Sequence, residues 1–305
     1  MSGRELRHRL EHAGFRLLSR LLRVLPERAA LGLGALLGRF AGGVLRIRRR
    51  EVDAHLALAF PERPPSWRRR VAAASYAHLG REAVALFRMA GMDAADIRAR
   101  TSVHGLEELK GALASGTGVV VVTGHLGNWE IGGAALTARG FPVEAVAKGM
   151  ANRRFDRDLV ATRERLGLRV VGMEEAPRRI LRALREGRVA ALVADQNFRR
   201  GGVFVPFFGV AAATAKGPAL FALRTGAPLF LAVSLREEGA PPRYRVDLRP
   251  VTVEPTGDLD ADVRRLTEAY TAALEREVRA APGQYFWQHK RWKTRPPAAT
   301  AETGS

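Results

Sequence analysis

Short apolar segments alternate with longer, helix-periodic segments from about residue 101 onward, and this alternation limits the possible folds most strongly. Parallel strands need a long crossover between them, which is usually a helix. The alternation therefore predicts an α/β fold, with a mostly parallel central sheet flanked by helices. The predicted strands are Val119–Thr123, Val143–Ala147, Arg169–Val171, Val189–Ala194, Val203–Pro206, Leu229–Ser234 and Tyr244–Val253; the predicted helices are Leu106–Ser115, Trp129–Arg139, Arg153–Leu166, Ala176–Glu186, Ala215–Thr225 and Leu259–Ala281.

The preceding residues 1–100 are expected to be helical and to associate with a membrane. Residues 4–25 place arginines on one helical face and leucines on the other, as in helices that lie on anionic membranes; a packed helix with a solvated face is the alternative. The apolar run Ala29–Leu45 has 17 residues and includes Arg39. A spanning helix needs about 20. We therefore expect this run to be buried or interfacial, with a tilted span left open.

The chain has 50 lysines and arginines but only 31 acidic residues, which gives a formal charge of +19. A charge of this size indicates an anionic partner. Twelve arginines and only three glutamates lie in residues 1–50. Nucleic acid, anionic lipid and an acidic carrier protein all fit such a charge. No nucleic-acid-binding motif accompanies it, so we expect no nucleic acid partner. The chain has no cysteine, which excludes disulfides, thiolate metal sites and a cysteine nucleophile.

The segment GVVVVTGHLGNWEIGGAAL (118–136) carries the predicted chemistry. An apolar strand leads into His125, a glycine-bounded turn follows, and Asn128 is placed to cap the next helix, so that Glu130 falls in its first turn. Ligands gather at the carboxyl ends of strands in such sheets. We predict that Glu130 accepts a hydrogen bond from one nitrogen of His125, leaving the other as a general base. Gly124 would keep side chains away from a substrate.

A histidine–glutamate pair without a serine or cysteine nucleophile favours direct transfer, in which the base activates an acceptor hydroxyl. No G-x-S-x-G turn is present, so an acyl-enzyme has no obvious nucleophile. Hydrolysis by an activated water is the alternative reaction, and a structural loop histidine is the alternative role for His125. No cofactor or metal is expected.

Segments that follow one another along residues 15–297 resemble the bacterial lipid A biosynthesis acyltransferases. These are the late lauroyl and myristoyl transferases of the wider lysophospholipid acyltransferase superfamily. The similar segments are LPERAALGLGALLG (25–38), AFPER (59–63), TGHLGNWE (123–130, the family's H-x4-D/E motif), RERLG (163–167), ADQNFRRGGVFVPFFGVAAAT (194–214) and QYFWQHKRWKTRPP (284–297). Two departures are His55-Leu56, where the family usually has Asn-Leu, and a less hydrophobic N-terminal segment.

The resemblance implies that His125 and Glu130 are catalytic. It also implies a glycerolipid acyltransferase-like fold, an acyl carrier protein or acyl-CoA as donor, and a lipid A precursor or similar glycolipid as acceptor. Phosphatidylinositol mannoside or phospholipid acylation with acyl-CoA is the alternative. The expected location is the cytoplasmic face of the inner membrane. The expected substrate-binding residues are Gly124, Asn128, Lys148, Arg163, Arg165, Asp195 and Gln196.

Two further groups of residues are candidates for substrate contact. Phe204, Phe207 and Phe208 either line an acyl pocket or belong to the core. Residues 288–295 form a cationic segment that either contacts lipid headgroups and an acidic carrier protein or is merely exposed. The expected organisation is a helical region at 1–100, an α/β acyltransferase core at 101–297 and a disordered tail at 298–305.

Overall fold

The computed structural model describes residues 3–199, 201–239 and 241–296, so the tail predicted at 298–305 lies outside the described residues. A seven-stranded sheet in the order β1-β9-β8-β2-β5-β3-β4 forms its centre. All neighbouring strands are parallel except β8 and β9. The predicted α/β class is therefore confirmed. The strands are β1 (Thr101–His104), β2 (Val119–Gly127), β3 (Val143–Ala147), β4 (Arg169–Gly172), β5 (Val189–Val193), β8 (Leu229–Arg236) and β9 (Tyr244–Pro250).

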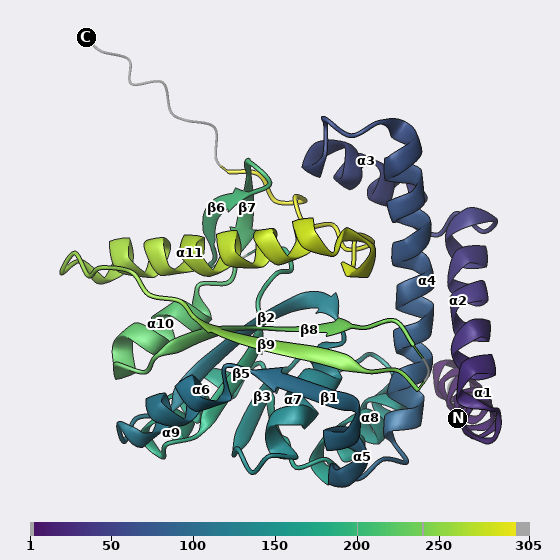
Figure 1. Ribbon diagram of the computed structural model, residues 1–305, viewed down its shortest axis with the longest axis horizontal. Coiled ribbons are helices and arrows are strands. Elements are labelled where there is room, and N and C mark those ends of the chain that lie inside the picture. Colours follow the sequence, from purple (N-terminus) through teal and green to yellow (C-terminus); the bar gives the residue numbers. More distant parts are fainter. Residues whose placement is uncertain (1–2, 200, 240, 297–305) are drawn as a thin grey trace.

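Helices cover both faces of this sheet (Figure 1). Alternate residues of β2 point to opposite faces, with Val120 and Val122 in one hydrophobic cluster and Val119 and Val121 in the other. The first cluster includes residues of α9 (Ala176–Arg185), α10 (Gly217–Thr225) and α11 (Leu259–Ala280), and the second includes residues of α5 (Ala94–Arg100), α6 (Leu106–Ala114) and α7 (Trp129–Thr137). Helix α8 (Arg153–Arg165) connects β3 to β4.

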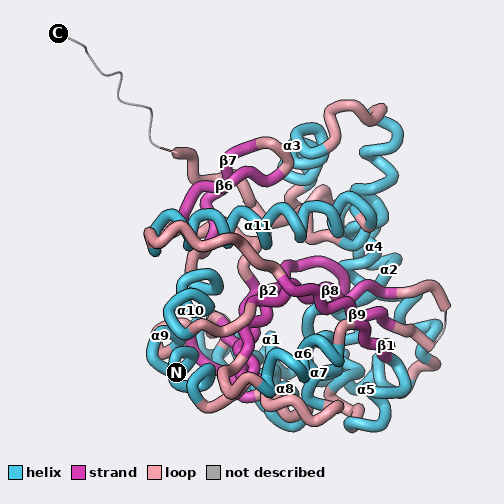
Figure 2. The backbone as a smooth tube through the Cα atoms, turned by 60° about the vertical axis from the view of Figure 1, so that its left-hand side comes forward, coloured by secondary structure: helices cyan, strands magenta, loops and turns pink. Residues whose placement is uncertain are grey.

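The segment that includes the predicted strand Val203–Pro206 lies outside the central sheet. It forms β6 (Val203–Phe207), which pairs only with the antiparallel β7 (Val210–Thr214) among the described residues. Phe208 and Gly209 between them both have positive φ, 53° and 72°, which is the geometry of a tight hairpin turn. This hairpin lies beyond α11, away from the main sheet (Figure 2). Strands β1 and β7 were not predicted, and helix α5 was not predicted as a separate element of the helical region.

Helices α1 (Gly3–Val24), α2 (Glu27–Gly43), α3 (Arg49–Ala59) and α4 (Pro65–Met89) precede the sheet. Helix α2 runs beside α4 (Figure 1) and touches it through glycines. A Cβ at Gly38 would lie 2.0 Å from the carbonyl oxygen of Tyr76, and one at Gly80 equally close to that of Gly34. The apolar run at 29–45 therefore turns its small residues inward, and Leu36, Leu37 and Phe40 stay exposed. That this helical region is a separate domain stays a prediction.

None of the helices in the described residues is long and apolar enough to cross a membrane.

Candidate functional site

His125 lies near the carboxyl end of β2, where the pairing with β8 is irregular between Thr123 and Gly127. The strand continues past its predicted end at Thr123, because its last residues find a new partner in the C-terminal segment. The carbonyl of His125 accepts a hydrogen bond from the amide of Phe286 at 3.0 Å, and Leu126 forms an isolated bridge with Tyr285. The backbone at His125 is thus held by a segment about 160 residues away along the sequence.

Asp195 is the hydrogen-bond partner of His125, and the prediction that Glu130 holds this place is wrong. Asp195 Oδ1 lies 2.6 Å from His125 Nδ1, and Oδ2 accepts the backbone N–H of His125 at 2.8 Å. The Asp195 side chain is only 3% exposed. It follows β5, the parallel neighbour of β2, so the two carboxyl ends lie side by side. An acidic residue directly after a buried strand was the sequence signal for this contact.

Glu130 lies in the first turn of α7, as predicted, but its carboxylate pairs with Arg163 of α8. Arg163 Nε donates to Oε2 at 2.8 Å, and Nη2 donates to Oε1 in a second, short contact. Both side chains are largely buried, at 13% and 17% exposed. Such a two-point contact fixes the orientation of both planar groups. Arg163, which we predicted to bind substrate, therefore has a partner within the protein, and its contact with substrate stays a prediction.

The electrostatic surroundings of His125 favour its protonated form. Burial lowers the pKa of His125, but the charge and hydrogen bond of Asp195, together with the charge of Glu130, outweigh burial and raise it above its ordinary value. Burial alone would raise the pKa of Asp195. The charge of His125 and its hydrogen bonds to Asp195 outweigh burial, so the pKa of Asp195 lies below its ordinary value. Asp195 thus remains a carboxylate that can stabilise a positive charge on the imidazole.

The second ring nitrogen of His125 is the one available for chemistry. When Nδ1 carries the proton and donates to Asp195, Nε2 has a lone pair that can accept a hydrogen bond or a proton. The amide nitrogen of Gln196 lies 3.1 Å from Nε2. The ring of Trp129 meets the imidazole edge-on, with centroids 4.5 Å apart. A substrate hydroxyl that replaced Gln196 at Nε2 would stand where a general base can take its proton.

The two turn residues predicted to contact substrate, Gly124 and Asn128, have packing roles. A Cβ at Gly124 would lie 2.6 Å from Leu274 of α11 and 3.1 Å from Asp195, so a larger residue there would require these side chains to shift. Asn128 caps α7 as expected, since its side chain accepts the N–H of Ile131 at 3.0 Å. Asn128 is 4% exposed. Substrate contact by either residue stays a prediction.

The remaining predicted cations differ in how they are engaged. Arg165 donates to the carbonyls of Met92 at 2.7 Å and Met89 at 3.1 Å, so it ties α8 to the end of α4. Lys148 is exposed in the loop between β3 and α8. Substrate contact by Lys148 or Arg165 stays a prediction.

The C-terminal segment 288–295 is not an exposed tail throughout. Arg291 is 2% exposed and donates to the carbonyl of Ala213 at 2.8 Å and to Thr214 Oγ1 at 2.6 Å. His289 Nε2 accepts the backbone N–H of Asn197 at 3.0 Å, and burial lowers the pKa of His289 to about 4. Three residues of the segment are exposed, namely Lys290, Lys293 and Arg295. The segment therefore supports the loop that carries Asp195 and Gln196. Its positive charge had not indicated this structural role.

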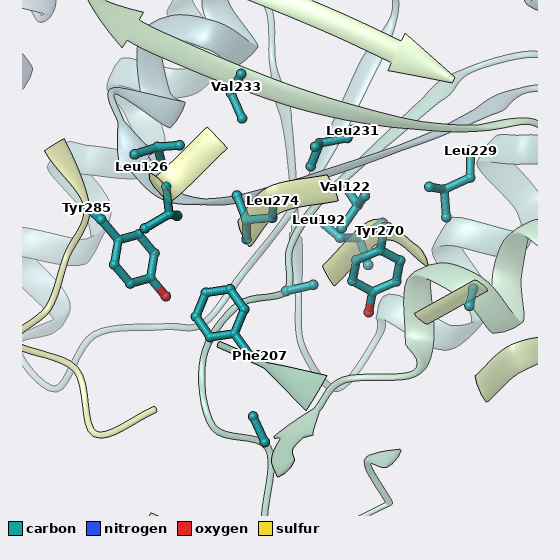
Figure 3. Close-up of a cluster of buried hydrophobic side chains, with 14 of the residues drawn as sticks. Val122, Leu126, Leu192, Phe207, Leu229, Leu231, Val233, Tyr270, Leu274 and Tyr285 are labelled. Atoms are coloured by element: carbon teal, nitrogen blue, oxygen red, sulfur yellow. The ribbon is translucent and has the colours of Figure 1, made fainter. Parts of the chain in front are cut away.

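The predicted acyl-pocket aromatics are mostly core residues. Phe207 is 0% and Phe208 6% exposed, and both belong to the large hydrophobic cluster. Figure 3 shows Phe207 among Leu274, Tyr270 and Tyr285. A cavity bordered by Phe207, Leu274 and Asp195 measures only about 10 Å³, room for one water and not for an acyl chain. Phe204 is partly exposed, and its contact with an acyl chain stays a prediction.

Comparison with known proteins adds a family to this geometry. Residues 4–294 match the family described as bacterial lipid A biosynthesis acyltransferase. The chain is 35% identical over 218 residues to a phosphatidylinositol mannoside acyltransferase of Mycolicibacterium smegmatis, covering 69% of this chain and 70% of that protein. It is 28% identical over 274 residues to the lipid A biosynthesis palmitoleoyltransferase of Escherichia coli (89% and 87%), and 27% identical over 278 residues to the lauroyltransferase of the same organism (89% and 88%).

Proposed function

We propose a reaction for this chain, which belongs to the bacterial lipid A biosynthesis acyltransferase family and is therefore an acyltransferase. It moves a fatty acyl group from the thioester of acyl carrier protein or coenzyme A to a hydroxyl of a lipid A precursor or a similar glycolipid. The observation that carries the proposal is the His125 imidazole, held by Asp195 through Nδ1 and contacted at Nε2 by the side-chain amide of Gln196, which an acceptor hydroxyl would replace.

His125 acts as the general base in this proposal. Nε2 takes the proton of the acceptor hydroxyl while the oxygen attacks the thioester carbonyl. The carbon–sulfur bond then breaks, and the thiol leaves with the proton returned from the imidazolium. Asp195 stabilises the imidazolium that forms in between, as the acid of a catalytic triad does. No covalent acyl-enzyme is needed.

Glu130 contributes its charge in this proposal. It raises the pKa of His125 without being its hydrogen-bond partner, so it also stabilises the imidazolium. Arg163 holds the Glu130 carboxylate in place from α8. Glu130 therefore keeps a role in the proposal through its charge, and Arg163 has a positioning role.

We further propose that α1 and α2 rest on the cytoplasmic face of the inner membrane. Leu17 of α1 is 70% exposed and Leu36 of α2 is 62% exposed, and they belong to a larger group of exposed apolar side chains. Such groups mark interaction surfaces. Exposed arginines of α1 accompany them, among them Arg16 and Arg20, which suits anionic lipid. We call this set the N-terminal apolar surface: Leu17, Leu18, Leu21 and Val24 of α1, and Leu33, Leu36, Leu37 and Phe40 of α2.

Acylation of a phosphatidylinositol mannoside or phospholipid with acyl-CoA is the second candidate. The specific observation in its favour is the 35% identity to the mycobacterial enzyme, which exceeds the 28% to the palmitoleoyltransferase. The longer coverage of the lipid A enzymes, 89% of this chain, favours the first candidate.

Purified protein incubated with each donor and each acceptor tests the proposal, with products identified by mass spectrometry. We expect an acylated glycolipid, formed by the wild type and lost in His125→Ala. Release of free fatty acid at a rate that does not depend on the acceptor would identify a hydrolase and contradict the proposal.

A further inference from the structure

A buried carboxylate on α4, outside the reacting groups, lies beneath the turn that follows His125. Glu82 is 9% exposed. Its Oε2 accepts hydrogen bonds from Asn128 Nδ2 at 2.7 Å and from the Tyr244 hydroxyl at 2.9 Å. Its Oε1 accepts one from Arg236 Nη1 at 2.9 Å. A buried carboxylate is tolerated when donors and a counter-charge surround it, and Glu82 has both.

The donors around Glu82 come from three different parts of the fold. Asn128 caps the start of α7, Arg236 ends β8 and Tyr244 begins β9. Burial and the neighbouring Glu82 charge raise the pKa of Tyr244, so its hydroxyl keeps the proton that it donates. Arg236 is itself only 11% exposed and also donates to the Tyr244 oxygen at 2.9 Å. Removal of the Glu82 charge would leave this arginine buried without its counter-charge.

Asn128 connects Glu82 to the site. Its amide nitrogen points to Glu82 while its amide oxygen caps α7, so the side chain is held at both ends. Its backbone N–H also donates to the Ser234 carbonyl at 2.8 Å. Asn128 lies between His125 and Glu130, three residues after the first and two before the second. The orientation of its side chain therefore sets where α7 begins relative to the imidazole.

A second contact from α4 acts on the same turn. His78, one helical turn before Glu82, has Nε2 3.2 Å from the carbonyl oxygen of Gly127. Gly127 has a φ of +64°, and a Cβ there would lie 1.9 Å from the Ser234 carbonyl oxygen. Helix α4 thus holds two consecutive residues of the turn, Gly127 and Asn128, with two side chains one turn apart.

We propose that Glu82 is a positioning residue, which acts through Asn128 to hold the Glu130–Arg163 pair in register with His125. This inference rests on the proposed function. It assigns to α4 a part in the site besides the packing of α2. Glu82 touches no reacting atom, so its loss should change the rate of the chemical step and leave acceptor binding nearly unchanged.

The test compares Glu82→Gln with Glu144→Gln. Glu144 is also a buried carboxylate, 3% exposed, and pairs with Arg188 at 3.0 Å near the amino ends of β3 and β5, remote from His125. We expect both variants to lose thermal stability. Only Glu82→Gln should lower kcat per folded molecule, by about tenfold to a hundredfold as small misplacements do, with KM nearly unchanged.

Asn128→Ser provides a second route to the same answer. Serine still caps a helix well but lacks the amide that reaches Glu82. If the two residues act as one unit, Asn128→Ser should lower kcat as Glu82→Gln does, and the double variant should lose little more. Losses that multiply in the double variant, or an equal kcat loss in Glu144→Gln, would overturn the proposal.

A readout without turnover separates this proposal from the proposed function. Proton NMR titration of the His125 ring, assigned by comparison with His125→Ala, reports the charges around it, which are Asp195, Glu130 and the nearby His289. We expect its pKa to fall in Glu82→Gln, because Glu130 is displaced, and to stay unchanged in Glu144→Gln. An unchanged pKa in Glu82→Gln would overturn the positioning role even if acyl transfer were demonstrated. A lowered pKa in a protein without transferase activity would instead count against the function.

Discussion

Charged side chains are buried near the carboxyl ends of β2 and β5, whereas apolar side chains are exposed along α1 and α2. At the strand ends, carboxylates are buried and paired, Asp195 with His125 and Glu130 with Arg163. Along α1 and α2, leucines and a phenylalanine face outward. Buried polar pairs fix geometry at a cost in desolvation, whereas exposed apolar groups gain free energy only when something covers them. The first region is therefore built for chemistry and the second for contact.

Replacement of the base should have the largest effect. We expect His125→Ala to lower kcat by about 10² to 10⁴-fold, the usual cost of losing a general base. The variant should fold, because the imidazole supplies little of the hydrophobic core. Transfer measured by mass spectrometry with a detergent-dispersed acceptor checks this. His104→Ala, at the exposed end of β1, is the control and should act like the wild type. Near-normal turnover of His125→Ala would refute the mechanism.

Replacement of the acid next to the base should have a smaller effect and also move the pH profile. We expect Asp195→Asn to lower kcat by about 10²-fold, a typical contribution of a positioned proton-transfer partner. Asp195 raises the pKa of His125, so its removal lowers that pKa. The base must be neutral, so the acidic limb of the pH–rate profile should move to lower pH.

Asp262→Asn is the matched control for that experiment. Asp262 is also buried, at 5% exposed, but it accepts hydrogen bonds from Thr256 at the start of α11. We expect a loss of stability in this variant without a shift of the acidic limb. A shift of equal size in both variants would mean that the limb does not report His125.

Substitutions on the N-terminal apolar surface should separate the two regions. We expect Leu36→Asp with Phe40→Asp to weaken binding to anionic vesicles by at least about 10²-fold, because two buried apolar side chains together contribute about 3–6 kcal/mol. The kcat in detergent and the melting temperature should stay unchanged. Co-sedimentation with vesicles measures the binding. Leu259→Asp on α11, where Leu259 is 42% exposed, should leave vesicle binding intact. An equal loss there would remove the distinction between the two regions.

Charge reversal on α1 should have the smallest effect. We expect Arg16→Glu with Arg20→Glu to weaken vesicle binding about tenfold to thirtyfold at low salt, since each basic residue near an anionic surface contributes about 1 kcal/mol. The difference from the wild type should shrink as salt is added. Arg178→Glu with Arg179→Glu, exposed on α9, is the charge-matched control. Equal weakening by both pairs would show that net charge matters and the position on α1 does not.

The α/β class and the location of His125 were predictable because both depend on local patterns. Apolar runs of strand length alternate with helices, and the histidine follows such a run. The partner of His125 was not predictable in the same way. Asp195 is 70 residues away and reaches His125 only because β5 pairs with β2, which periodicity along one segment does not reveal.

Arg291 shows the same limit for burial. An arginine in a basic segment is expected to be exposed to solvent. Arg291 is buried instead, because oxygens of Ala213 and Thr214 accept hydrogen bonds from its guanidinium. Those acceptors belong to β7, a strand that the sequence did not reveal. For the apolar run of α2 the sequence left burial and an interfacial position open, and in the structure its glycines pack against α4 while Leu36 and Leu37 are exposed. Which face of an apolar helix turns inward depends on how closely a neighbour can approach.

The pairing of His125 with Asp195 rather than Glu130 can be observed directly as the low-field proton NMR signal of a short Nδ1–H hydrogen bond. The signal is to be recorded in the wild type, Asp195→Asn and Glu130→Gln. We predict that it is present in the wild type, persists in Glu130→Gln and disappears in Asp195→Asn. Loss in Glu130→Gln with persistence in Asp195→Asn would contradict the account.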